Sequence, residues 1–256
     1  ITCSAGGSGT AGIPTSQVAA FVKNEVQIEP LTHITCVGSS EADLNDNLQH
    51  LMASGIRNIM CLRGDINPEL PLHKDFLHAS DLAAYIQKHY GCFGLSGACY
   101  PQHHPEAASL LEDVQNLKIK EEAGVTHLVS QLFFDNNDFY SFLYRVRQAG
   151  ITVPVEAGIM PVTNRKQIER MVSLCGASLP KKFVRIMHRY GDDPAAMQDA
   201  GIMEIASNPE AYVRYLELQG DNPHYSPGNI ALAMFQNPEV TQFGTREKWK
   251  TMGRSV

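Results

Sequence analysis

The residues best suited to chemistry in this sequence stand at the ends of short apolar runs. The run over 57–62 is followed directly by Arg63, Gly64 and Asp65. Glycine allows the backbone to approach a ligand closely, and arginine offers a planar fork of donors for a phosphate or a carbonyl. Asp65 can accept a hydrogen bond or tune a nearby ring. The alternative is a turn with a surface ion pair, and the motif alone does not decide between the two.

A second group begins at Tyr100, reads YPQHHPEA, and is followed by Asp113, Asn116 and Lys120. Pro105 suits the first turn of a helix, so the pattern predicts a helix over 105–123. On such a helix the last three residues share one face. Asp and Asn suit ribose hydroxyls and Lys suits a diphosphate, which together predict a dinucleotide site. An ordinary solvated helix face explains the same spacing and is favoured from the residues alone.

Two further candidates lie within apolar runs. His33 stands in the segment THITC, where a histidine is more often a core residue than a ligand. No other His or carboxylate stands at a recognisable ligand spacing, so we expect no metal site. Gln131 opens the segment QLFFD, and its carboxamide can pair with the donor–acceptor edge of a pterin-like ring.

Apolar runs rich in β-branched residues and cysteine alternate with segments of helical periodicity. The predicted strands are 1–5, 31–37, 57–62, 92–98, 126–133, 152–157 and a final candidate at 229–235. The predicted helices are 15–24, 40–54, 80–90, 105–123, 137–149, 164–175, 181–190 and 201–218. Strand and helix alternation of this kind predicts an α/β fold with a parallel sheet.

The sheet is either open and doubly wound or closed into a barrel. No GxGxxG motif follows an early strand, which disfavours the first option. The polar residues cluster at the carboxyl ends of strands, as a barrel active site requires. We therefore predict a TIM-type (β/α)8 barrel that occupies residues 1–256 as a single domain. Its missing strand would precede Ile1, and the role of the extension from about residue 220 is left open.

Composition excludes several classes of partner. Acidic residues outnumber basic ones 27 to 21 without a polybasic run, so nucleic acid and anionic membrane are not expected partners. No apolar run approaches the roughly 18 residues of a membrane-spanning helix, and no signal peptide is visible. The six cysteines form no CxxC pair and are expected to be reduced core thiols. Together these features predict a cytoplasmic protein.

Eight collinear segments resemble the methylenetetrahydrofolate reductase family. They run from Ile1 to about residue 179 and read ITCSAGGSGT, THITC, IRNIMCLRGD, HASDL, CYPQHHPEA, DVQNLKIK, SQLFFD and GIMPVTNRKQ. The resemblance implies a barrel that holds FAD at its carboxyl-terminal face. It implies reduction of methylenetetrahydrofolate to methyltetrahydrofolate, with NADH or NADPH as hydride donor. The flavin would carry the hydride, and the protein would position and polarise the reactants.

The resemblance also implies roles for individual residues. The flavin contacts would be Thr2, Cys3, Ala5, His33, Arg63, Gly64, Asp65, His78, Ala79, Tyr100, His104, Ala107, Asp113, Asn116 and Lys120. Gln131 and Asp65 would bind the folate. Asp65 would act as the catalytic residue, because a carboxylate near the flavin disfavours negative charge on its reduced form.

The chain departs from the family pattern at four places. The family's catalytic glutamate, in a segment like FEFFPP, has no counterpart, and His78 and Arg165 replace usual aromatic residues. The closing strand lacks the His and Tyr of the family's HxYTxN. These departures leave two alternatives open. One is a flavin-free relative with the same substrate, and the other is a non-catalytic homologue that serves as a binding or assembly subunit. We expect a homo-oligomer or a subunit of a cytoplasmic complex.

Overall fold

The computed structural model describes residues 14–37, 39–65, 75–158, 164–193 and 196–197. These residues fall into two compact units. The first lies within 1–131 and 139–156, and the second lies within 132–138 and 157–256. The first unit contains alternating strands and helices, as the sequence predicts, and the described part of the second unit contains helices. The prediction of one barrel domain over 1–256 stays a prediction.

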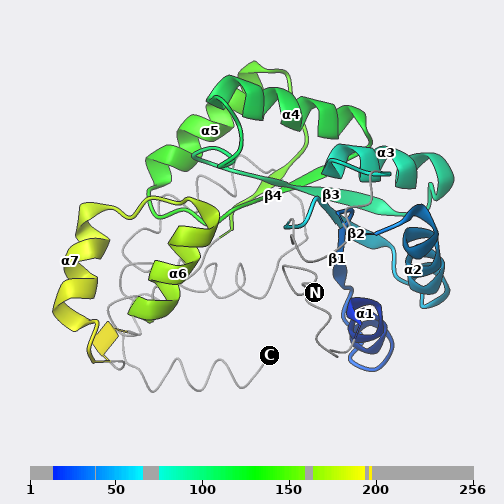
Figure 1. The fold of residues 1–256 in the computed structure, drawn as a ribbon, viewed down its shortest axis with the longest axis horizontal. Coiled ribbons are helices and arrows are strands. Elements are labelled where there is room, and N and C mark those ends of the chain that lie inside the picture. The colour runs from blue at the N-terminus through cyan, green and yellow to red at the C-terminus, as the bar shows by residue number, and fades with distance from the viewer. Residues whose placement is uncertain (1–13, 38, 66–74, 159–163, 194–195, 198–256) are drawn as a thin grey trace, which may run out of the picture. The chain divides into compact units, whose positions relative to one another are not determined.

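The first unit is organised around a five-stranded parallel sheet whose strands follow the order of the chain (Figure 1). The strands are β1 (Leu31–Thr35), β2 (Asn58–Leu62), β3 (Gly94–Cys99), β4 (His127–Ser130) and β5 (Val155–Glu156). They confirm the five strands expected between residues 31 and 157, and each strand is shorter than the apolar run that predicted it. The predicted strands at 1–5 and 229–235 lie outside the described residues.

Helices connect these strands. The first unit contains α1 (Thr15–Asn24), α2 (Glu41–Ala53), α3 (Ala79–His89), α4 (Leu110–Glu122) and most of α5 (Asn136–Gln148). The expected serine cap of α2 is confirmed, since Ser40 Oγ accepts from the backbone N–H of Asp43 at 3.2 Å. The predicted helix over 201–218 lies outside the part that the structure describes.

The predicted start of the fourth helix is wrong. Pro105 does not open it, and α4 begins only at Leu110. Ser109 is the residue that starts the helix, because its Oγ accepts from the backbone N–H of Glu112 at 3.2 Å. The Glu112 carboxylate in turn accepts from the backbone N–H of Ala108 at 2.6 Å. This reciprocal pairing satisfies the amide of Glu112 in the first turn and that of Ala108 just before the helix, and the preceding segment forms a loop.

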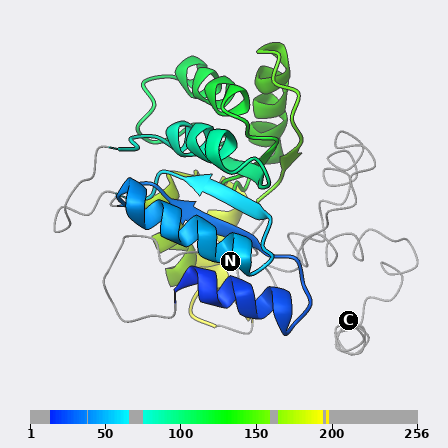
Figure 2. The same ribbon diagram turned by 90° about the vertical axis from the view of Figure 1, so that its right-hand side faces the viewer.

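The arrangement is that of a barrel and not of a doubly wound sheet. A doubly wound sheet reverses its strand order at a switch point and carries helices on both faces. Here the order is sequential, and α2, α3, α4 and α5 all lie on the same side of the sheet (Figures 1 and 2). The sheet therefore has one face covered by helices and one face turned away from them.

Strand register separates the residues of the two faces. One row across all five strands joins Ile34, Cys61, Gly97, Leu128 and Val155. A Cβ built on Gly97 would lie 3.6 Å from Lys120 Cδ on α4, so this row faces the helices. The adjacent row joins His33, Met60, Ser96 and His127 and faces the opposite side. Three of these four side chains are polar, which is unusual for the face of the sheet that is turned away from the helices.

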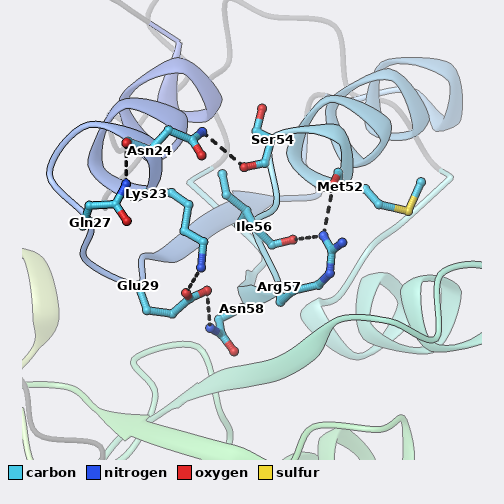
Figure 3. A network of polar contacts seen from close by, with 9 residues as sticks. All are labelled: Lys23, Asn24, Gln27, Glu29, Met52, Ser54, Ile56, Arg57 and Asn58. Atoms are coloured by element: carbon cyan, nitrogen blue, oxygen red, sulfur yellow. Dashed lines mark hydrogen bonds and ion pairs between the residues drawn. The ribbon is translucent and has the colours of Figure 1, made fainter.

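Side-chain contacts tie the loops that enter β1 and β2 at the amino-terminal end of the sheet (Figure 3). Lys23 pairs with Glu29, and the Glu29 carboxylate also accepts from Asn58 Nδ2 at 3.2 Å. Arg57 Nη1 donates to the backbone carbonyl of Met52 at 3.1 Å. In a barrel this end serves stability, whereas the carboxyl-terminal end carries chemistry.

The second unit contains α6 (Arg165–Cys175) and α7 (Lys181–Tyr190). Its core holds Ile168, Phe183, Met187 and Met197, all less than a tenth exposed. The ring of Phe134 lies 5.4 Å from that of Phe183, centroid to centroid. This unit therefore has an apolar cluster of its own.

The five described cysteines, at 36, 61, 92, 99 and 175, are free thiols, of which four are buried, as expected, whereas Cys92 is exposed. Burial raises the pKa of Cys36 to about 11 and that of Cys61 to about 12. Buried thiols of this kind are inert small apolar groups.

None of the helices in the described ranges combines the length and the apolar character that crossing a membrane requires.

Candidate functional site

Four of the residues selected from the sequence directly follow strands of the first unit. Arg63 and Gly64 follow β2, Tyr100 follows β3, and Gln131 follows β4. Parallel strands end at the same edge of their sheet, so these residues lie along one edge. The backbone N–H of Gln131 donates to the carbonyl of Cys99 at 2.7 Å, which continues the strand pairing beyond the formal end of β4. This edge is where a barrel carries its active site.

Gly64 is required by the packing of the fold. Its φ of +85° is a conformation that side-chain-bearing residues rarely adopt. A Cβ at this position would lie 2.9 Å from Cβ of Thr35, too close for any real contact. The backbone approach that the glycine allows is therefore to β1. Packing against the neighbouring strand is by itself sufficient reason for a glycine here, and a role of Gly64 in ligand approach stays a prediction.

Arg63 is held by a residue that sequence reasoning did not select. Its guanidinium pairs with both carboxylate oxygens of Glu106, with Nη2 to Oε1 at 2.8 Å. Its Nε donates to the carbonyl of Gly64 at 3.3 Å. The hydrogen-bonded carboxylate raises the pKa of Arg63, and the guanidinium lowers the pKa of Glu106. The pair joins the loop after β2 to the loop after β3.

His104 occupies the centre of the loop between β3 and α4. Its Nδ1 accepts from the backbone N–H of Glu106 at 3.1 Å, and its own backbone N–H donates to Asp113 Oδ2 at 3.0 Å. Its ring and that of Tyr100 pack edge to face, with 4.7 Å between centroids. Because Nδ1 accepts, the neutral ring carries its proton on Nε2. Burial lowers the pKa of His104, which favours this neutral form.

Helix α4 contributes one carboxylate and one ammonium on the side facing the sheet. Asp113 is 8% exposed, and Lys120 Nζ donates to the carbonyl of Ala98 at 2.8 Å. Burial lowers the pKa of Lys120, while the charge of Asp113 opposes this effect. Asn116, which was expected on the same face, is exposed. Of the three residues predicted to share this helix face, only Asp113 and Lys120 are turned towards β3.

Not all of the selected residues join this group. Asp65, His78 and Asn116 are exposed, whereas Ala79 is buried in the first turn of α3. The backbone N–H of His78 donates to the Asp81 carboxylate, a contact that starts that helix. The backbone N–H of Ala107 donates to the carbonyl of His104 at 3.0 Å, within the same loop as the other contacts of His104. The predicted flavin contacts Thr2, Cys3 and Ala5 lie outside the described residues.

Two observations concern histidines within the sheet. Burial lowers the pKa of His33, in the middle of β1, to about 4, so this side chain is neutral at neutral pH. His127 Nε2 lies 2.8 Å from Glu156 Oε1, a side-chain contact between β4 and β5 that sequence reasoning also missed. Across the described ranges, no group of three His, Cys, Asp or Glu side chains could hold a metal ion.

Comparison with known proteins gives a consistent result. A family model described as methylenetetrahydrofolate reductase matches residues 1–212. A rice protein, "Probable methylenetetrahydrofolate reductase (NADH)", is 34% identical over 79% of this chain and 36% of its own. The "5,10-methylenetetrahydrofolate reductase" of Pectobacterium carotovorum subsp. carotovorum is 33% identical over 73% of this chain and 62% of its own. The chain thus spans between about a third and two thirds of the length of these relatives.

One solved structure has a similar fold. It is described as "Uncharacterized protein from Clostridium thermocellum binds two copies of 5-methyl-5,6,7,8-tetrahydrofolic acid". It superposes with a TM-score of 0.51 at 15% identity and covers 83% of this chain and 76% of its own. At that identity the likeness establishes the fold.

Proposed function

Because the chain belongs to the methylenetetrahydrofolate reductase family, whose fold is an α/β barrel, we propose that it reduces methylenetetrahydrofolate to methyltetrahydrofolate in one-carbon metabolism. Relatives at about one-third identity carry names with this activity, some with NADH and one with NADPH as donor. We propose a nicotinamide cofactor as hydride source and leave open which of the two it is. The observation that carries the proposal is the linked group Arg63, Glu106, His104 and Asp113, with Lys120 beside it, at the edge where a barrel binds substrates.

The donors of this group fit FAD. Lys120 is a half-buried ammonium that has one carbonyl contact and one neighbouring carboxylate, so an anionic ligand would stabilise its charge. A diphosphate supplies that charge. His104 presents Nε2–H as a donor, and Asp113 keeps acceptor capacity suited to a ribose hydroxyl. The other flavin contacts that we propose are His33, Gly64, His78, Ala79, Tyr100, Ala107, Asn116, Thr2, Cys3 and Ala5.

Bound FAD would supply hydride transfer, and this chain's residues would bind, orient and polarise. We propose that Asp65 lies near the pyrimidine edge of the flavin, where its carboxylate disfavours negative charge. Gln131 would hold the folate through its carboxamide. Both residues follow strands at the carboxyl-terminal edge, as their roles require. The neighbour from Clostridium thermocellum is described as a protein that binds a reduced folate, which agrees with a folate pocket on this fold.

We further propose that the protein acts in the cytoplasm, as a homo-oligomer or as a subunit of a complex.

Spectroscopy of the purified protein tests the proposed function directly. An absorption spectrum with maxima typical of oxidised flavin is expected, together with bleaching by NADH or NADPH under anaerobic conditions. A colourless protein that still binds folate would support the flavin-free alternative. A protein that binds neither flavin nor folate would support the role of an assembly subunit.

A further inference from the structure

Glu106 makes two different contacts to two residues of the proposed flavin site. Its carboxylate engages Nη1 and Nη2 of Arg63, while its backbone N–H donates to Nδ1 of His104. The two partners come from different loops, since Arg63 follows β2 and His104 follows β3. Glu106 therefore connects the loops at the point where both present donors.

The side-chain contact constrains the Arg63 guanidinium completely. Three of its five N–H groups are used, two by Glu106 and one by the carbonyl of Gly64. A guanidinium held on two edges cannot rotate, so the direction of its two remaining N–H groups is set by the protein. Without Glu106, a long side chain with several rotamers would have to be ordered when a ligand binds.

The backbone contact constrains the protonation pattern of His104. An amide N–H can only donate, so Nδ1 must accept and the ring of neutral His104 must carry its proton on Nε2. The neighbouring His103 has the opposite arrangement, because its Nδ1 lies 2.9 Å from the carbonyl of His104 and must donate to it. The loop thus presents one defined donor from His104.

We infer that Glu106 is a positioning residue of this site, which orients Arg63 through its carboxylate and His104 through its amide without contacting the ligand itself. This inference rests on the proposed function, because it concerns how the same flavin site is organised. Stability of the fold is not the reason for the ion pair. The Glu106 side chain is 60% exposed and that of Arg63 is 26% exposed, and pairs of this kind contribute little to stability. The pair instead orders the donors of the site before the ligand binds, which lowers the entropic cost of binding.

A double-mutant cycle on flavin affinity tests the inference. The proteins are the parental chain, Glu106→Ala, Arg63→Ala and the double variant, each stripped of flavin and titrated with FAD. Glu106→Ala is expected to weaken binding about tenfold in the parental background and by less than about twofold in the Arg63→Ala background. Glu106→Gln keeps one acceptor oxygen, so its Kd should fall between those of the parental chain and the Ala variant. Melting temperatures of the flavin-free proteins should agree closely.

Glu169→Ala is the matched control, because it removes an exposed glutamate that pairs with Arg165 on α6. Its flavin affinity should equal that of the parental protein. The inference is overturned if Glu106→Ala binds flavin as tightly as the parental chain, or loses affinity equally with and without Arg63. It is also overturned if the loss follows a lowered melting temperature. If the parental protein itself binds no flavin, the proposed function fails instead, and the two failures are distinct.

Discussion

At the scale of single residues, the two cations of the site have different surroundings. Arg63 is neutralised by both oxygens of Glu106, whereas Lys120 has the carbonyl of Ala98 and the nearby Asp113. Removing water from an ammonium is unfavourable unless another charge compensates. Lys120 is therefore the residue that gains most from an anionic ligand, and Arg63 acts through the direction of its donors.

Replacing Lys120 with Ala should accordingly weaken flavin binding by roughly 1–3 kcal/mol, the loss expected for a hydrogen bond to a charged group. Titration of the flavin-free variant with FAD measures this loss. Lys118→Ala is the control, since Lys118 lies on the same helix but pairs with Glu121. Equal flavin affinity of the Lys120 variant and the parental protein would show that the diphosphate does not bind at this position.

Asp65 and Gln131 are expected to affect different steps. Replacing Asp65 with Asn should raise the midpoint potential of the flavin and slow its oxidation by folate, because a carboxylate that opposes negative charge is lost. Replacing Gln131 with Leu should mainly raise the KM for folate, because it removes binding that ground and transition states share. Timing the two half-reactions separately by flavin absorbance distinguishes these effects. If both variants reduce folate with parental rate and affinity, the substrate site lies elsewhere.

His33 should make stability depend on pH. Its pKa is lowered from 6.5 to about 4 in the folded protein because the ring is desolvated. Between these values the unfolded chain binds a proton that the folded chain does not, so the free energy of unfolding falls as pH is lowered through this window. Urea unfolding at about pH 7 and about pH 5 should show a smaller difference for His33→Gln than for the parental protein. An exposed-site control, His50→Gln, should retain the parental difference.

At the scale of elements, the side-chain contact between His127 on β4 and Glu156 on β5 joins two neighbouring strands. These side chains are 19% and 25% exposed, so each would be left largely desolvated without its partner. Either Glu156→Val or His127→Phe alone should lower the free energy of unfolding by about 1–3 kcal/mol. The double variant should lose less than the sum of the two, since it leaves neither polar side chain without its partner. Additive losses in urea unfolding would show that the pair does not couple the strands.

The elements show what local sequence patterns can predict. The helices α1 and α7 have the bounds expected from apolar spacing, because nothing in their segments competes with that period. The start of α4 was misjudged because Pro105 is compatible with a first helical turn, whereas Ser109 and Glu112 cap the actual one. Strand ends are hard to predict, since a strand ends where its partner stops pairing, as the two residues of β5 illustrate.

The site likewise contains residues that a local sequence pattern indicates and residues that it does not. Arg63, Tyr100 and His104 could be selected from the sequence because polar residues after apolar runs are conspicuous. Glu106 could not, because its partner is 43 residues away and an exposed glutamate has no local signal. The structural need for Gly64 was also invisible, since it arises from the Cβ of Thr35 on the neighbouring strand.

At the scale of the whole molecule, sequential strand order is the feature that connects fold to function. It brings the ends of β2, β3 and β4 to one edge, so donors from separate loops can serve one ligand. Every contact of the linked group lies within the first unit. The second unit has its own apolar cluster around Phe183 and Met187, and the contacts of the linked group do not depend on it.

The most direct test of the account is an anaerobic two-step reaction of the purified protein, followed at the flavin absorbance. Addition of NADH or NADPH should bleach a bound flavin, and subsequent addition of methylenetetrahydrofolate should restore its absorbance with formation of an equal amount of methyltetrahydrofolate. A protein that holds no flavin, or whose reduced flavin is not reoxidised by the folate, would contradict the proposed activity.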